Sequence, residues 1–111
     1  MDQLTHYRSI VKRILATHAE HVPSHGKLET LPLFDDNHDN YALLDVGWDR
    51  MGRVHAVVLH LRLQGGKVWI EQDGTEEGVA EELLAAGIPK EDIVLGFYRP
   101  ERRMITEFAV G

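Results

Sequence analysis

The sequence contains no cysteine. This absence excludes a disulfide framework, a zinc site with thiolate ligands and a thiol nucleophile. It fits a protein of the reducing cytoplasm, and we expect that location. The first residues also lack the basic start and apolar core of a signal peptide. No apolar run approaches the roughly 18 residues that a membrane-spanning helix needs, so we expect no contact with a membrane.

Basic residues are in the minority as well. The chain has 12 Lys and Arg against 18 Asp and Glu, which gives a net charge of −6. Such a surface repels phosphate backbones on average, so that only a local basic patch offers a route to DNA. With 111 residues, 43% of them hydrophobic, the chain suits one domain with its own core. We therefore predict a single domain over residues 1–111.

Alternation of apolar residues predicts most of the strands. The predicted strands span residues 28–34, 41–48, 53–63, 67–72 and 93–98. Pro32 cannot donate a hydrogen bond to a neighbouring strand, which predicts an edge position for the first of them. The third has apolar residues on both faces along part of its length, with Val57, Leu59 and Leu61 expected on one side. Such a strand is typically central or lies at a contact between subunits, so a homodimer is a further expectation.

Two helices accompany these strands. Apolar residues at three- and four-residue spacing predict a helix over residues 3–18. A second helix should follow the fourth strand, because Asp73 or Thr75 can cap it and Glu76 completes the spacing of a capping box with Asp73. Gly87 suits a left-handed cap at its end. The predicted fold class is α+β, an antiparallel β-meander packed against an N-terminal helix and a second helix after the fourth strand.

Seven histidines raise the question of a metal site. His18 and His21 lie three residues apart near the predicted helix end, with His25 close by. A catalytic zinc site needs a third ligand and an open position, and the spacing is one residue short of the HExxH motif. On a regular strand His55 and His60 fall on opposite faces, so they should not converge on one ion. We therefore predict no metal.

The carboxylates offer a second route to metal chemistry. The acidic loop over residues 35–40 has oxygen ligands but lacks the glycine and distal glutamate of a calcium-binding loop, which favours a solvated turn. Asp45, Glu71 and Asp73 lie on neighbouring predicted strands, and their convergence would give a magnesium-dependent nuclease. Such a site usually needs a nearby lysine, which this segment lacks. We predict no catalytic residue and no cofactor, and keep the nuclease as a lesser alternative.

Basic residues gather near the C-terminus, namely Arg99, Arg102 and Arg103. With Tyr98 beside them they form a candidate grip for a phosphate or a carboxylate, although pairing with glutamates on the surface is the plainer interpretation. A direct DNA-binding factor would need these arginines to form one face with the basic residues of the first helix, which are Arg8, Lys12 and Arg13. That arrangement is a second functional alternative.

Long segments of the chain resemble the XisI family. They are YRSIVKRIL, LLDVGWDRMGRVHAVVLHL, GGKVWIEQDGTEEGVAEELLAAGIPKEDIVLGF and RPERRMITEFAV. Together they extend over essentially the whole sequence, and the pattern is long and specific.

The resemblance implies an excision controlling factor of the cyanobacterial kind. Such proteins are named for their role, with a recombinase and a companion protein called XisH, in removing an element that interrupts the fdxN gene. The family is regarded as accessory, since recombinase chemistry belongs to another protein. We therefore expect a non-catalytic factor that acts through an XisH-like partner and touches DNA only indirectly. An exposed apolar patch with Trp69, Tyr98 or Phe108 is the expected partner contact.

Overall fold

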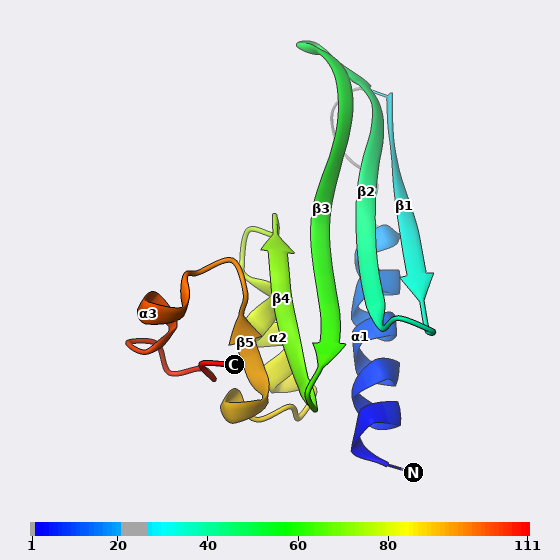
Figure 1. The fold of residues 1–111 in the computed structure, drawn as a ribbon. Coiled ribbons are helices and arrows are strands. Elements are labelled where there is room, and N and C mark those ends of the chain that lie inside the picture. Colours follow the sequence, from blue (N-terminus) through cyan, green and yellow to red (C-terminus); the bar gives the residue numbers. More distant parts are fainter. Residues whose placement is uncertain (1, 21–26) are drawn as a thin grey trace.

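The computed structural model describes residues 2–20 and 27–111, and shows a five-stranded sheet with helices (Figure 1). The elements are α1 (Gln3–Ala19), β1 (Lys27–Asp35), β2 (Asn40–Asp49), β3 (Gly52–Gln64), β4 (Lys67–Asp73), α2 (Val79–Ala85), the short 3-10 helix η1 (Lys90–Asp92), β5 (Ile93–Leu95) and α3 (Pro100–Arg103). The strand order is β1-β2-β3-β4-β5, with β1 at an edge as Pro32 predicted. The α+β fold class is confirmed.

The last strand differs from a pure meander. β1 to β4 pair antiparallel, but β5 pairs parallel with β4. The connection through α2 carries the chain back along the sheet, so that β5 runs in the same direction as β4. β5 also ends at Leu95 and not near Tyr98 as predicted, because the Tyr98 N–H turns back to the Leu95 carbonyl at 3.1 Å.

α1 and α2 cover the same face of the sheet, and the core lies between them and the strands (Figure 1). Asp2 begins α1 by accepting a hydrogen bond from the Thr5 N–H at 2.7 Å. The fully buried side chains of this layer include Val11, Leu15, Tyr41, Leu61, Val68 and Leu83. In the described part of the chain, no helix is long and apolar enough to cross a membrane.

α2 begins later than the sequence predicted. Its N-cap is Gly78, at a φ of 89°, so Glu76 precedes the helix and the predicted capping box is wrong. Asp73 nevertheless caps the helix from a distance, because its Oδ2 accepts the Val79 N–H at 2.8 Å. At the other end Gly87 has the predicted positive φ, 102°.

A β-bulge in β3 changes which side chains share a face. Leu43 pairs with Leu59 while Leu44 pairs with Val57, so Val58 is the extra residue. The prediction that Val57 shares a side with Leu59 is therefore wrong. Leu59 faces the helices and is buried, whereas Val57 faces away and is 45% exposed.

The bulge moves the two histidines of β3 onto one face. His55 pairs with Val46 and His60 pairs with Ala42, and both partners point away from the helices. The expected opposite placement is wrong, because it assumed a regular strand. The partners Ala42 and Val46 lie four positions apart on β2, which still separates the two histidines by about 13 Å, too far to share an ion.

No helix of the described residues covers the face of β1 to β3 that points away from α1 and α2 (Figure 1). Its apolar side chains are Leu31, Leu33, Ala42, Leu44, Val46, Trp48 and Val57, and we call this set the open face. Antiparallel sheets with one solvated face normally carry polar residues there. The sequence therefore supplies apolar residues to both faces of these strands.

Candidate functional site

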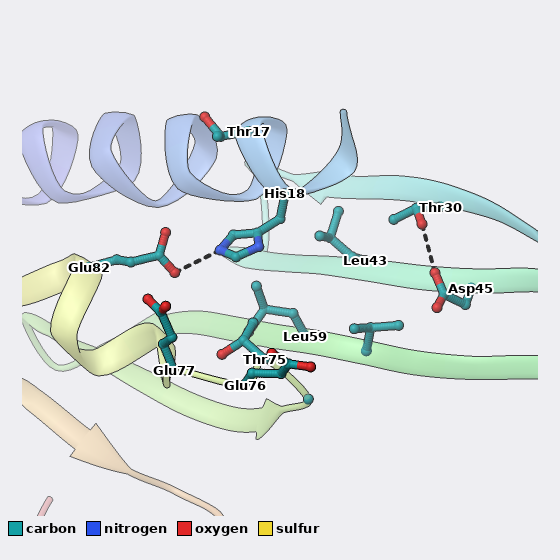
Figure 2. Close-up of a pocket in the computed structure, with 12 residues that line it drawn as sticks. Thr17, His18, Thr30, Leu43, Asp45, Leu59, Thr75, Glu76, Glu77 and Glu82 are labelled. Carbon is teal, nitrogen blue, oxygen red and sulfur yellow. Dashed lines mark hydrogen bonds and ion pairs between the residues drawn. The ribbon is translucent and has the colours of Figure 1, made fainter. Parts of the chain in front are cut away.

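A pocket of about 660 Å³ opens between the end of α1, the segment before α2 and the helix-facing side of the sheet (Figure 2). Its floor is apolar, with Leu43, Val58 and Leu59. Its walls are polar, and half of their residues are acidic: Thr17, His18, Thr30, Asp45, Thr75, Glu76, Glu77 and Glu82. The pocket exists because α2 has only 7 residues and begins after Glu76 and Glu77, so that no second helix fills this end.

Two pairs of polar side chains in this pocket bond to each other. His18 Nε2 lies 2.7 Å from Glu82 Oε2, which joins the end of α1 to α2. The Thr30 hydroxyl donates to Asp45 Oδ1 at 2.7 Å. Four carboxylates against one histidine favour a cationic group and repel a phosphate. Among the described residues no group of metal-ligating side chains converges, and His21 and His25 lie outside those residues.

The three carboxylates of the nuclease alternative do not come together. Asp45 bonds Thr30 on the side of the sheet that faces the helices. Glu71 forms an ion pair with Arg62, and the Arg62 guanidinium lies over the Trp69 ring. Arg62 and Trp69 pair on the side of the sheet that faces away from the helices. Asp73 Oδ1 accepts the N–H and the hydroxyl of Thr75 while its Oδ2 caps α2. The predicted trio therefore forms no single metal site.

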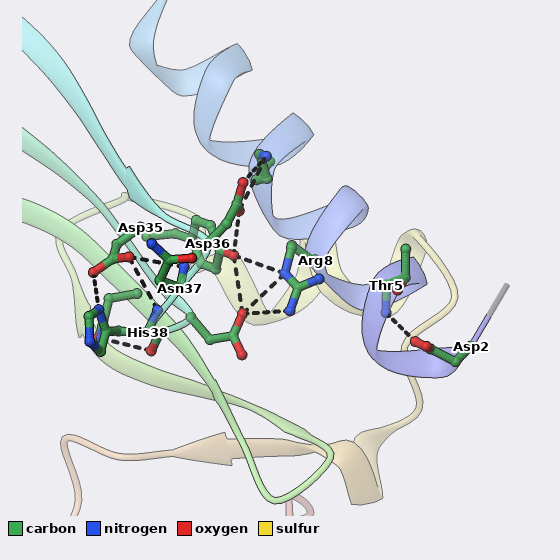
Figure 3. A network of polar contacts seen from close by, with 11 residues as sticks. Asp2, Thr5, Arg8, Asp35, Asp36, Asn37 and His38 are labelled. Carbon is green, nitrogen blue, oxygen red and sulfur yellow. Dashed lines mark hydrogen bonds and ion pairs between the residues drawn. The ribbon is translucent and has the colours of Figure 1, made fainter.

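The acidic loop docks on α1 through two ion pairs (Figure 3). Arg8 Nη2 lies 2.8 Å from Asp39 Oδ1, and Lys12 Nζ lies 3.0 Å from Asp36 Oδ2. Between them the Tyr41 hydroxyl donates to Asp36 Oδ1 at 2.8 Å and accepts from Arg8 Nε at 3.1 Å. The loop is a turn as predicted, with Asp36, Asn37 and His38 exposed, and two of its carboxylates also hold it against α1.

The same network shifts two ionisation equilibria. Burial, together with the hydrogen bond to Asp36, raises the pKa of Tyr41 far above its ordinary value. The Tyr41 hydroxyl and then the Lys12 ammonium lower the pKa of Asp36. At neutral pH Asp36 is therefore charged and Tyr41 is neutral, which is the combination that keeps Arg8 and Lys12 bound to the loop. These two cations are not a free surface for DNA.

The arginines of the C-terminal segment have different roles. Arg103 donates to the carbonyls of Tyr98 at 3.0 Å, of Val110 at 3.2 Å and of Gly96 at 3.5 Å. It also lies 5.1 Å from the centre of the Trp69 ring. Arg103 thus holds the segment after β5 against the sheet and is not available to grip a phosphate.

The other two predicted arginines are exposed. Arg102 lies 5.0 Å from the centre of the Tyr98 ring, and Arg99 precedes α3 as its N-cap residue. Arg13 is also exposed. Because Arg8, Lys12 and Arg103 are all held in contacts within the chain, the described residues do not assemble the full basic face that direct DNA binding required. Contact of Arg99 and Arg102 with nucleic acid stays a prediction.

The predicted partner residues are only partly accessible. Phe108 packs against the core, and Trp69 and Tyr98 are half-buried. The more exposed apolar residues of the segment after β5 are Phe97 at 48%, Met104 at 73%, Ile105 at 83% and Val110 at 51%. We call these four residues with Trp69 and Tyr98 the tail surface. The signal that sequence reasoning missed is the pair Met104-Ile105 directly after a four-residue helix that buries none of its side chains.

Comparisons with family models and with solved structures identify relatives of this chain. The family model for the XisI protein matches residues 1–110. The fdxN element excision controlling factor XisI from Anabaena variabilis ATCC 29413 has a solved structure with 39% identity and a TM-score of 0.83, over 99% of this chain and 100% of that one. A XisI-like protein from the same organism has 34% identity and a TM-score of 0.90, over 97% and 99%. No curated protein matches.

These features define an α+β protein whose most prominent exposed features are two apolar surfaces, the tail surface and the open face. Several ionisable groups of the described residues pair with each other, as Arg8 does with Asp39 and His18 with Glu82. The family match and the identity of the solved relatives then settle the affiliation. The chain belongs to the XisI family.

Proposed function

We propose that this protein is an accessory factor that controls excision of a DNA element and acts in the cytoplasm by binding an XisH-like protein. The role in excision is supported by family membership and by the name of the Anabaena relative, an excision controlling factor. The proposal assigns recombination chemistry to other proteins.

The tail surface is the observation that carries the proposal. Ile105 and Met104 expose most of their side chains although Arg103 fixes the backbone on both sides of them. Ordering a segment costs conformational entropy, and apolar side chains on an ordered segment regain free energy only when something covers them. A partner of about standard interface size would bury such a patch at its centre.

Direct DNA binding is the less favoured function. It needs free cations on one face, and Arg8, Lys12 and Arg103 are each engaged with groups of this chain. The net charge of −6 works against it over the rest of the surface.

Co-purification with an XisH-like protein, followed by gel-shift assays on element-end DNA, tests the proposal. We expect a stable complex, and a shift with the partner or the pair but not with this chain alone. No association, together with salt-sensitive DNA binding by this chain alone, would contradict the proposal and favour the DNA-binding alternative.

A further inference from the structure

The open face has the anatomy of a protein interface. Across β1, β2 and β3, Leu31 pairs with Leu44 and Leu44 pairs with Val57, which places an apolar row at its centre. Leu31 is 39% exposed, and its neighbour Leu33 is 54% exposed. Large apolar patches on a finished domain mark interaction sites, and this one has polar and charged residues around it.

The register places a carboxylate and an imidazole on either side of the central strand. Glu29 on β1 and His55 on β3 both pair with Val46, so they lie at the same level on opposite sides of β2. A two-fold axis that runs along β2 exchanges the two sides, so β1 of one copy lies over β3 of the other. Glu29 then meets His55 of the second copy, and this contact occurs twice.

The same operation matches the apolar residues. Leu31 and Val57 both lie at the level of Leu44, so each Leu31 meets a Val57 of the second copy and the two Leu44 side chains meet at the axis. Lys27 and Arg53 both pair with Trp48, which lies four residues along β2 from Leu44. There the axis brings like charges together. Packed sheets cross at about 30°, which separates the strand ends and leaves the Leu44 row in closest contact.

The size of the face sets the expected strength. β1 and β2 contain 9 and 10 residues. Three strands of this length, at about 3.3 Å per residue and about 4.8 Å apart, cover roughly 400 Å² in projection before side-chain relief is added. Weak specific interfaces bury up to about 600 Å² on each partner. The face therefore fits a second copy at the lower end of that range.

We propose that a second copy of this chain covers the open face, in a two-fold dimer of sheet against sheet with β2 over β2. This inference concerns a different surface from the tail surface and does not rest on the proposed function. Cross-linking and sedimentation test it on the chain alone, so a monomeric result in them leaves the partner complex untouched.

The absence of cysteine makes a clean cross-linking test possible. Leu44→Cys places one thiol beside the axis, where the thiol of the second copy lies, whereas Met51→Cys places it at the β2–β3 turn on a residue that is 95% exposed. With a short bismaleimide we expect a covalent dimer from Leu44→Cys and little from Met51→Cys. Random collision would favour the more exposed Met51→Cys, so equal yields, or none from Leu44→Cys, overturn the proposal.

Sedimentation velocity of the cysteine-free chain gives an independent measurement. We expect a concentration-dependent dimer whose dissociation constant rises more than about tenfold in Val57→Lys, because each copy contributes one buried charge, and is unchanged in the control Met51→Lys. Circular dichroism confirms that both variants fold. A chain that stays monomeric while Val57→Lys blocks the XisH-like protein would overturn the dimer and give the open face to that partner.

Discussion

The guanidinium carbon of Arg103 lies 5.1 Å from the centre of the Trp69 ring, while the guanidinium donates to carbonyls on both sides of it in the chain. One side chain thus ties the segment after β5 to β4. The exposed position of Ile105, and with it the proposed partner contact, depends on this attachment.

Arg103→Ala should release the segment. We expect the unfolding free energy to fall by about 1–2 kcal/mol, since hydrogen bonds to a charged donor are lost, and amide exchange over residues 96–111 to accelerate. Arg103→Lys should restore little, because an ammonium cannot reproduce the planar fork. Arg102→Ala is the control, since Arg102 stacks on Tyr98 at the surface. Equal exchange in the two alanine variants would show that Arg103 does not hold the segment.

Tyr41→Phe should weaken the docking of the acidic loop on α1. It removes the hydroxyl that donates to Asp36 and accepts from Arg8, and we expect a loss of about 1–2 kcal/mol by urea denaturation. Tyr98→Phe is the matched control, because the described part of the chain shows no hydrogen bond from the Tyr98 hydroxyl. If both variants unfold at the same urea concentration, the network contributes nothing to stability.

Stability should decline in acid through the same loop. Tyr41 and Lys12 hold the pKa of Asp36 below its ordinary value, so Asp36 stabilises the fold above about pH 4 and loses this effect as the pH falls through its folded pKa. The variant Asp36→Asn should be less stable than the parent at neutral pH and nearly equal to it in strong acid. Urea midpoints across this range measure the difference. A gap between the two proteins that stays constant with pH would be the opposite result.

In alkaline solution the stability should fall as the pH rises. Burial raises the pKa of Tyr7 and Tyr41 in the folded state. Their neutral forms stabilise the fold fully below about pH 10, and this stability is lost as the pH rises towards the folded pKa. After a jump to high pH, we expect the phenolate absorbance of these two tyrosines to develop at the rate of unfolding. Immediate ionisation of all three tyrosines would mean that both hydroxyls are accessible in the folded chain.

Gly47→Ala should disrupt the contact between β1 and β2. At a φ of 149° a Cβ on residue 47 would lie 2.0 Å from the Lys27 carbonyl oxygen. Gly52 has a comparable φ of 124°, but its Cβ would meet nothing within 4 Å. Gly47→Ala should therefore cost about 1–3 kcal/mol more than Gly52→Ala in thermal or urea unfolding. If the two variants lost similar amounts of unfolding free energy, the effect would come from backbone strain alone and not from the contact with Lys27.

The sequence predicted element type better than it predicted faces. Period-two alternation located β2 and β3, but the bulge at Val58 reversed the sides of Val57 and His55 relative to the rest of β3. A bulge leaves no mark on composition, because it depends on the pairing between strands. The late start of α2 has a similar cause, since Gly78 and the distant carboxylate of Asp73 replaced the local capping box.

The candidate surfaces depended still more on tertiary contacts. Trp69, Tyr98 and Phe108 were predicted from residue type, yet exposure is set by what covers each one, and the core covers Phe108. Arg8 and Lys12 looked free along the helix, but the acidic loop that neutralises them is more than twenty residues away in sequence. The open face was visible only as apolar residues on both sides of β3, which raised a subunit contact without locating it.

The central claim, that the tail surface binds an XisH-like protein, is tested most directly by isothermal titration of that partner into three forms of this chain. They are the parent, Ile105→Asp and the control Met51→Asp, which exchanges an even more exposed apolar residue at the β2–β3 turn. The account predicts that Ile105→Asp weakens binding by more than about tenfold and that Met51→Asp binds like the parent. Equal affinity of all three forms would contradict it.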